Sequence, residues 1–410
     1  MVCVARKNDN TAYAWGHPNK GGNAVDANNN PIDLTNVADI SCGKNACVVR
    51  KNDNTAVVWG DANSGGDIRC TSADCTPLPT SVTLTNVADI SCGEEACVAR
   101  KHNGDAYAWG SYSVGGDAVD ANDNPIDLKN VVDISCGGNA CVARKHNGDA
   151  YAWGYAGYGG DIRCTSADCT PMPAGVDLKN VVDISCGEKA CVARKHNGDA
   201  YAWGDVGYGG NIRCTSADCT PMPAGVDLTD VADISCGGRA CVARKKNGDA
   251  YAWGDAGYGG TAPSLTNVAD ISCGKNACVA RKHNGDAYAW GRLDASSVDL
   301  TGVADISCGK NACVARKNDG TVEAWGHPDW GGNAPSLTNV ADISCGGYAC
   351  VARKHDGTAV AWGDASVGGD ASSVDLNLKV VDASDPLDLG FTCSPATTAQ
   401  LRMAMNDQNC

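Results

Sequence analysis

Apolar and polar residues alternate in short runs along this chain, and the same runs recur many times. Within residues 87–110, VADISCGEEACVARKHNGDAYAWG, such runs lie at Val87–Ser91, Ala96–Lys101 and Asp105–Trp109. A period of two residues is typical of a β-strand whose two faces differ. We therefore predict three short strands per unit. No segment of the repeat has a helical period, which favours an all-β architecture.

The third run of this unit separates large from small side chains. Tyr107 and Trp109 lie on one face of the expected strand, and alanines occupy the other. Stacked sheets would then place the indole of one sheet against the methyl groups of the next. The Asn-Gly pair at 103–104 joins the second and third runs and predicts a type I′ hairpin turn, in which both central residues have positive φ.

Tryptophan marks the period of the repeat. Nine of the ten tryptophans precede a glycine in the same phase, at Trp15, Trp59, Trp109, Trp153, Trp203, Trp253, Trp290, Trp325 and Trp362. Successive units are 35 to 50 residues long. Repeats of this length are typical of solenoids, propellers and arrays.

The two ends of the chain complement one another. The chain begins at the second strand of a unit, and Leu378–Ser384 matches the missing first strand. A C-terminal strand that completes the N-terminal sheet would close a ring and leave no open sheet edge. We therefore predict a closed β-propeller of about nine blades over residues 1–384. Each blade would have three or four short strands, and residues 385–410 would form a tail.

The repeat resembles that of the regulator of chromosome condensation family, whose propeller blades carry a CG…DG.VY.WG signature. The matching residues are Cys92-Gly93, Asn103-Gly104, Tyr107 and Trp109-Gly110. The resemblance implies a β-propeller fold. It implies little about function, because the family includes nucleotide exchange factors, chromatin binders, enzyme inhibitors and a photoreceptor.

Cysteine is abundant, with 25 residues, and 22 of them form pairs separated by four residues. A four-residue loop brings its flanking cysteines opposite one another, whereas a zinc knuckle usually has two intervening residues. We predict eleven disulfides, each worth ~2 kcal/mol in the chain-entropy model. The pairs are Cys42 with Cys47, Cys70 with Cys75, Cys92 with Cys97, Cys136 with Cys141, Cys164 with Cys169, Cys186 with Cys191, Cys214 with Cys219, Cys236 with Cys241, Cys273 with Cys278, Cys308 with Cys313, and Cys345 with Cys350. Cys3 is left to pair with Cys393 or Cys410.

The predicted disulfides and the net charge indicate the cellular compartment of the protein and the classes of partner that it binds. So many disulfides predict an extracellular, cell-surface or other oxidising compartment. The first ten residues contain no apolar stretch like that of a signal peptide. The alternative is therefore a cytosolic chain whose cysteines are reduced. The formal net charge of -15 disfavours nucleic acid as a partner. No apolar run is long enough to predict a membrane span.

The segments that follow each Trp-Gly differ between units. Residues 67–79, 161–173 and 211–223 are long and contain a cysteine pair, residues 23–34 and 118–128 are long without one, and the later segments are shorter. We predict that the long segments form a contact arc, since variable loops on a rigid scaffold commonly bind partners. Solvated spacers are the alternative. The candidate binding residues are Arg69, Arg163, Arg213, Asp74, Asp168 and Asp218.

Two other polar patterns contain residue types that bind metal ions or act in catalysis. Asp120, Asn122, Asp123 and Asn124 resemble a cadherin calcium linker and offer hard oxygen ligands, but a plain Asx-rich turn is the competing interpretation. No other cofactor is predicted. Five histidines share one phase before a hairpin turn, which indicates exposed turn residues: His102, His146, His196, His283 and His355.

The sequence therefore predicts a non-enzymatic structural or protein-interaction module that binds a protein partner or belongs to a larger assembly. It contains no P-loop, GxSxG or HExxH motif. One alternative is a lectin-like or calcium-assisted ligand binder, with a glycan as its ligand. A second, implied by the resemblance alone, is a regulator of a small GTPase or of chromatin.

Overall fold

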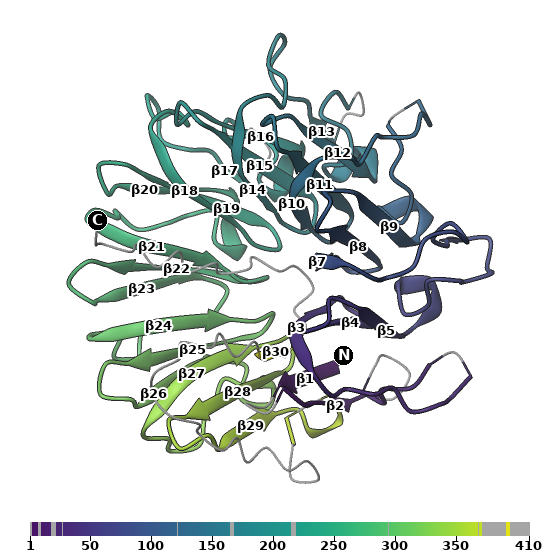
Figure 1. Cartoon of the computed structure of the whole chain (residues 1–410). Coiled ribbons are helices and arrows are strands. Elements are labelled where there is room, and N and C mark those ends of the chain that lie inside the picture. The colour runs from purple at the N-terminus through teal and green to yellow at the C-terminus, as the bar shows by residue number, and fades with distance from the viewer. Residues whose placement is uncertain are drawn as a thin grey trace, which may run out of the picture.

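The computed structural model describes residues 2–6, 10–17, 22–26, 28–120, 122–164, 168–214, 219–293, 295–367, 369–370 and 391–393. In this part of the chain, short strands form nine antiparallel sheets of three or four strands, arranged around a common centre (Figure 1). The all-β class predicted from the alternating pattern is confirmed.

Eight sheets each take three consecutive strands from one unit. The first strands are β3 (Val37–Cys42), β7 (Val87–Cys92), β10 (Val131–Cys136), β14 (Val181–Cys186), β18 (Val231–Cys236), β21 (Val268–Cys273), β24 (Val303–Cys308) and β27 (Val340–Cys345). The second strands are β4 (Ala46–Lys51), β8 (Ala96–Lys101), β11 (Ala140–Lys145), β15 (Ala190–Lys195), β19 (Ala240–Lys245), β22 (Ala277–Lys282), β25 (Ala312–Lys317) and β28 (Ala349–Lys354). The third strands are β5 (Ala56–Gly60), β9 (Ala106–Ser111), β12 (Ala150–Gly154), β16 (Ala200–Asp205), β20 (Ala250–Asp255), β23 (Ala287–Gly291), β26 (Val322–Gly326) and β29 (Ala359–Gly363).

Single 3-10 turns follow most of the third strands. They are η2 (Ala62–Ser64), η3 (Tyr112–Val114), η4 (Ala156–Tyr158), η5 (Val206–Tyr208), η6 (Ala256–Tyr258), η7 (Pro328–Trp330) and η8 (Ala365–Val367). Three sheets gain a fourth strand from a disulfide-containing long segment: β6 (Cys75–Thr76), β13 (Cys169–Thr170) and β17 (Cys219–Thr220). Each of these pairs with the third strand of the following unit, so the long segments have a structural role in the next sheet.

The ninth sheet joins the two ends of the chain. Its strands are β1 (Val2–Arg6), β2 (Ala12–Gly16) and β30 (Phe391–Cys393), with β1 in the middle. A C-terminal strand completes the N-terminal sheet as expected, but that strand is β30 and lies within the segment predicted to be a tail. The predicted closing strand Leu378–Ser384 lies outside the described residues. β30 contacts both β27 and β3, the strands of the last and first complete sheets.

The hairpin turn between the second and third strands differs from the prediction. Gly104 has a positive φ of 87°, whereas Asn103 is absent from the described residues with positive φ. The amide of Gly104 donates to the carbonyl of Lys101 at 2.9 Å, and the amide of Lys101 donates to the carbonyl of Asp105 at 2.8 Å. The loop therefore has three residues with a left-handed glycine at its end, and the type I′ prediction is wrong.

The core lies between neighbouring sheets. Trp253 is completely buried, and it packs with Val192, Ala200 and Ala202 of the preceding unit. The same arrangement recurs around Trp203, which packs with alanines of the unit before it. The predicted contact of indoles with the small face of the next sheet is confirmed.

Each of these indoles is also anchored by a hydrogen bond. Nε1 of Trp253 donates to the carbonyl of Gly209 at 2.8 Å, and Gly209 belongs to the Gly-Gly pair that follows the preceding Trp-Gly. Gly209 has a φ of 100°, and a Cβ there would press on the Sγ of Cys241. The exception is Trp325, whose buried Nε1 has no partner among the described residues. The preceding segment, GRLDASSVDL, contains no Gly-Gly pair.

This difference predicts unequal costs for the same substitution. Trp253→Phe removes a buried hydrogen bond and leaves the Gly209 carbonyl unpaired, whereas Trp325→Phe removes an indole N–H that has no partner among the described residues. We expect Trp253→Phe to lower the free energy of unfolding by about 1–2 kcal/mol more than Trp325→Phe. Urea unfolding of both variants with their disulfides intact measures the difference, and equal costs would contradict the role of the hydrogen bond.

Candidate functional site

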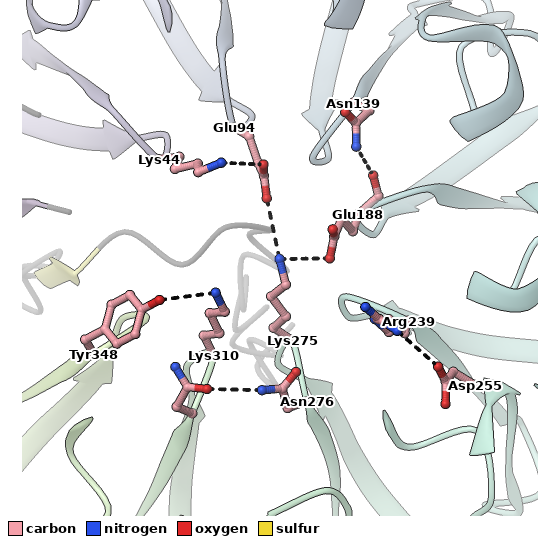
Figure 2. A network of polar contacts seen from close by, with 11 residues as sticks. Lys44, Glu94, Asn139, Glu188, Arg239, Asp255, Lys275, Asn276, Lys310 and Tyr348 are labelled. Carbon is pink, nitrogen blue, oxygen red and sulfur yellow. Dashed lines mark hydrogen bonds and ion pairs between the residues drawn. The ribbon is translucent and has the colours of Figure 1, made fainter. Parts of the chain in front are cut away.

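The hairpin turns between the first and second strands meet at the centre of the molecule (Figure 2). Each turn begins with the glycine of the Cys-Gly pair. A Cβ added there would lie less than 3.0 Å from the carbonyl oxygen of the corresponding glycine in the next sheet, as found for Gly43, Gly93, Gly137, Gly187, Gly237, Gly274 and Gly309. Only glycine permits such close packing of backbone on backbone. The two residues after each glycine therefore bring their side chains to the centre.

A partly buried ion cluster connects three turns that are not neighbours in the ring. The Nζ of Lys275 lies 2.9 Å from Oε2 of Glu188 and 3.7 Å from Oε1 of Glu94 (Figure 2). The side chains of all three are less than one-fifth exposed. Lys44 adds a more exposed contact with Glu94 at 3.4 Å. The charge of Lys275 is thus balanced by two carboxylates from other sheets.

A cavity of about 590 Å³ opens beside this cluster. It is lined by Glu188, Arg239, Tyr258, Lys275, Asn276, Arg292, Leu293, Lys310, Asn311, Gly326, His327 and Trp330. Its volume is in the range of small-molecule and peptide side-chain sites. The described residues that line it are mainly cationic, amide and aromatic, although the chain as a whole has a net charge of -15.

Tyrosines hold three of the four Lys and Arg side chains that line the cavity. The guanidinium of Arg292 donates to the hydroxyl of Tyr258 at 2.6 Å, and Nζ of Lys310 donates to the hydroxyl of Tyr348 at 3.3 Å. Arg239 lies over the ring of Tyr258 at 4.3 Å and contacts Asp255 at 3.5 Å. A neutral ring or hydroxyl fixes a cation without cancelling its charge.

Amides and stacked rings complete the wall. Nδ2 of Asn276 donates to Oδ1 of Asn311 at 3.2 Å, which fixes two neighbouring turns. The rings of His327 and Trp330 stack with centroids 3.8 Å apart, and Trp330 meets the edge of Tyr348 at 5.1 Å. The lining of the cavity therefore combines charged donors with a flat aromatic surface.

Aspartate–arginine pairs between the first and second strands add a second set of charges. One example is Asp233, whose carboxylate lies 3.9 Å from Arg244. Burial, together with the carboxylates of Asp183 and Asp270 in adjacent sheets, raises the pKa of Asp233 to about 6 against the opposing effect of Arg244. These pairs form within the sheets and lie outside the lining of the cavity, so we do not assign them to the site.

The three predicted binding arginines bind their own loops. The Nη1 of Arg69 donates to the carbonyls of Leu78 at 2.7 Å and Pro79 at 2.8 Å, and its Nη2 donates to that of Val82 at 2.7 Å. Arg163 and Arg213 make the corresponding bonds in the other two disulfide-containing segments. The structure thus gives these guanidinium groups a loop-closing role, and their contact with a partner stays a prediction.

The acidic residues of the same segments belong to separate units. Asp74 and Asp168 are exposed, and their backbone carbonyls accept hydrogen bonds from Tyr112 and Val206 of the following unit. Asp218 lies outside the described residues. The long segments belong to the earlier part of the ring, whereas the cavity is lined by the short segments that follow Trp253, Trp290 and Trp325.

The proposed calcium loop has the geometry of an Asx turn. Oδ1 of Asp120 accepts from the amides of Asn122 at 2.8 Å and Asn124 at 2.9 Å. Hydrogen bonds from the backbone and side chain of Asn124, and then from Asn122, lower the pKa of Asp120. Asp123 has a φ of 59°. Within the described residues, no group of three or more His, Cys, Asp or Glu side chains is placed to hold a metal.

All eleven predicted cysteine pairs form disulfides. Three of them close long segments, with Cα atoms 6.3–6.4 Å apart: Cys70 with Cys75, Cys164 with Cys169, and Cys214 with Cys219. The other eight cross the first hairpin of a unit, with Cα atoms 4.0–4.1 Å apart: Cys42 with Cys47, Cys92 with Cys97, Cys136 with Cys141, Cys186 with Cys191, Cys236 with Cys241, Cys273 with Cys278, Cys308 with Cys313, and Cys345 with Cys350.

The hairpin disulfides have a second role that the sequence did not predict. The later cysteine of each hairpin pair lies in a second strand and is almost completely buried in the core between sheets: Cys47, Cys97, Cys141, Cys191, Cys241, Cys278, Cys313 and Cys350. The spacing alone predicts only that these cysteines close short loops. They are structural residues of the core and lie outside the lining of the cavity.

The turn histidines lie where the sequence placed them. All five are exposed: His102, His146, His196, His283 and His355. They lie outside the lining of the cavity, so the histidine that contributes to the site is His327, from the segment after Trp325.

The central cavity was not predicted from the sequence. Its signal was present in the turn Cys-Gly-x-x-Ala-Cys, where the two middle residues vary among otherwise near-identical hairpins. These positions hold Glu94-Glu95 in one unit, Gly238-Arg239 in another and Lys275-Asn276 in a third. Variation at positions that meet at one point in the fold is the observation that would have indicated a site.

Nine small antiparallel sheets with a Trp-Gly repeat define the class of repeat-built β-propeller proteins. Residues 231–259 match the family model of the Regulator of chromosome condensation (RCC1) repeat, which confirms the resemblance seen in the sequence. No curated protein matches the chain. No helix in the described part of the chain is long and apolar enough to cross a membrane.

Solved structures with a similar arrangement are distant in sequence. The ectodomain of the receptor kinase CR4 from Physcomitrella patens is 18% identical, with 68% of this chain and 73% of that chain covered and a TM-score of 0.41. Human WBSCR16 is 16% identical, with 84% and 97% covered and a TM-score of 0.45. Prp20p from Saccharomyces cerevisiae, described with its binding to Gsp1p and histones, is 16% identical, with 84% and 89% covered and a TM-score of 0.45.

Proposed function

We propose that this chain is a non-enzymatic interaction module, built as a closed ring of nine blades and stapled by disulfides in an oxidising compartment. The central cavity, with the long-segment arc as a second surface, would bind a protein partner or connect the chain to a larger assembly. The observation that carries the proposal is a cavity of about 590 Å³ whose cations are held in place by tyrosines on a rigid ring.

The chemistry of the cavity favours binding over catalysis. The described residues that line it include no Ser, Thr or Cys, and their one carboxylate, Glu188, is paired with Lys275. A nucleophile next to a general base is the usual requirement for covalent catalysis. Fixed donors on a flat aromatic wall are instead typical of recognition.

The disulfides support the proposed compartment. Twenty-two cysteines form eleven bridges, each within one hairpin or loop. Reducing conditions in the cytosol would keep such thiols unpaired. Bridges of this kind also keep the turns that frame the cavity in position.

Affinity capture tests the proposed function. The immobilised chain with intact disulfides is expected to retain a discrete partner from the extracellular fraction of the source cells. The matched control is the same chain after reduction and alkylation, which keeps the sequence and removes the staples. Retention of no partner, or of the same proteins by both forms, would refute an interaction module that depends on the folded ring.

A further inference from the structure

We propose that the central cavity binds an acidic peptide segment through Arg239, Arg292 and Lys310. The inference rests on the proposed function and names the chemistry of the partner. These three cations come from three successive sheets: Arg239 from the turn between β18 and β19, Arg292 from the end of β23, and Lys310 from the turn between β24 and β25.

Two of these cations retain an unbalanced charge. In the part of the chain that the structure describes, the polar contact of Arg292 is with the Tyr258 hydroxyl, and that of Lys310 is with the Tyr348 hydroxyl. Neither forms an ion pair with a described carboxylate. Arg239 is paired with one carboxylate, Asp255 at 3.5 Å, and also lies over the ring of Tyr258. Lys275 is different, because two carboxylates, Glu94 and Glu188, contact it, and it is not part of the proposed recognition set.

The cations are fixed in place before a ligand arrives. Arg292 lies over the ring of Tyr258 at 5.4 Å and Lys310 over that of Tyr348 at 5.3 Å, in addition to their hydroxyl contacts. Tyr348 is in turn held by the edge contact with Trp330. A ligand therefore loses little affinity to the ordering of these long side chains.

The distribution of cations favours several carboxylates along an extended chain over one compact anion. The cations line one cavity from three successive sheets, and a peptide with repeated Asp or Glu residues can present one carboxylate to each. The stacked rings of His327 and Trp330 offer a flat surface for an apolar side chain next to the acidic run. Because the rest of the protein is acidic, an acidic segment is repelled elsewhere and directed to this cavity.

The test is fluorescence anisotropy with a labelled peptide of one Trp followed by six alternating Glu and Asp residues. Arg292→Gln and Lys310→Gln are each expected to weaken binding by about tenfold, since each removes a charge-assisted hydrogen bond. Lys246→Gln is the matched control. Lys246 is an exposed lysine in the turn between β19 and β20, outside the cavity lining, and its loss changes the net charge equally. We expect it to alter binding by less than about twofold.

Competing ligands separate the possible outcomes. Inorganic triphosphate that binds more tightly than the peptide and displaces it would overturn the peptide assignment in favour of a phosphate ligand. Equal binding of the peptide by wild type, Arg292→Gln and Lys310→Gln would overturn the site. If the peptide fails to bind while affinity capture still succeeds, this inference falls and the proposed function stands. If the capture also fails, both fall.

Discussion

Replacement of Cys393 by serine is expected to destabilise the protein far more than replacement of a cysteine in any hairpin pair. The backbone register places Cys3 opposite Cys393, as it places Cys47 opposite Cys42, which forms a disulfide. A bridge between residues 3 and 393 would close a loop of almost the whole chain. The chain-entropy model gives about 6 kcal/mol for such a loop and about 2 kcal/mol for a hairpin pair.

A tryptic digest identifies this bridge directly. After free thiols are blocked under acidic, denaturing conditions, the unreduced digest should contain MVCVAR linked to the peptide 380–402, which contains Cys393. Cys410 lies in a separate peptide, 403–410, so the two pairings are distinguishable. Cys410→Ser is the control and should change neither the linked peptide nor the urea midpoint. A blocked Cys3, or Cys3 linked to Cys410, would contradict the prediction.

The strands and the core could be predicted because they depend on a local, repeated pattern. Alternation in each unit identified which residues are strands, and the phase of Trp253 relative to its alanines identified what packs between sheets. The strand that completes the N-terminal sheet was harder to predict. Leu378–Ser384 resembles the beginning of a first strand, whereas Phe391–Cys393 resembles its end, Ile-Ser-Cys. The pairing of β30 with β1 follows this second match, which includes the cysteine.

The site could not be predicted in the same way, because it depends on contacts between units. Arg69 is repeated and polar, and these properties fit a partner contact as well as a loop closure. Only the three-dimensional structure shows that it donates to the carbonyls of Leu78 and Val82. Lys275 and Glu188 are 87 positions apart in the sequence, yet they form an ion pair at the centre. A single sequence does not indicate that two residues so far apart along the chain lie close together in the fold.

The close packing of the hairpin turns at the centre of the molecule explains why a glycine follows the first cysteine of each hairpin pair. We expect Gly187→Ala to lower the free energy of unfolding by about 3 kcal/mol, at the upper end of the cost of overpacking. Its new Cβ would lie less than 3.0 Å from the carbonyl oxygen of Gly237. The two sheets cannot move apart freely, because the amide of Cys236 donates to Oγ of Ser185 at 2.9 Å across the same interface.

The matched control is Gly175→Ala, in a long segment outside the ring of turns. Gly175 has a φ of 82° and no atom within 4 Å of an added Cβ, so its substitution tests only the cost of a left-handed alanine, about 1 kcal/mol. Gly187 has no such backbone requirement, so its larger cost would come from the contact between sheets alone. Urea unfolding of the two variants gives the comparison. An equal or smaller cost for Gly187→Ala would show that the turns can separate, and that the centre of the ring is not held by backbone packing.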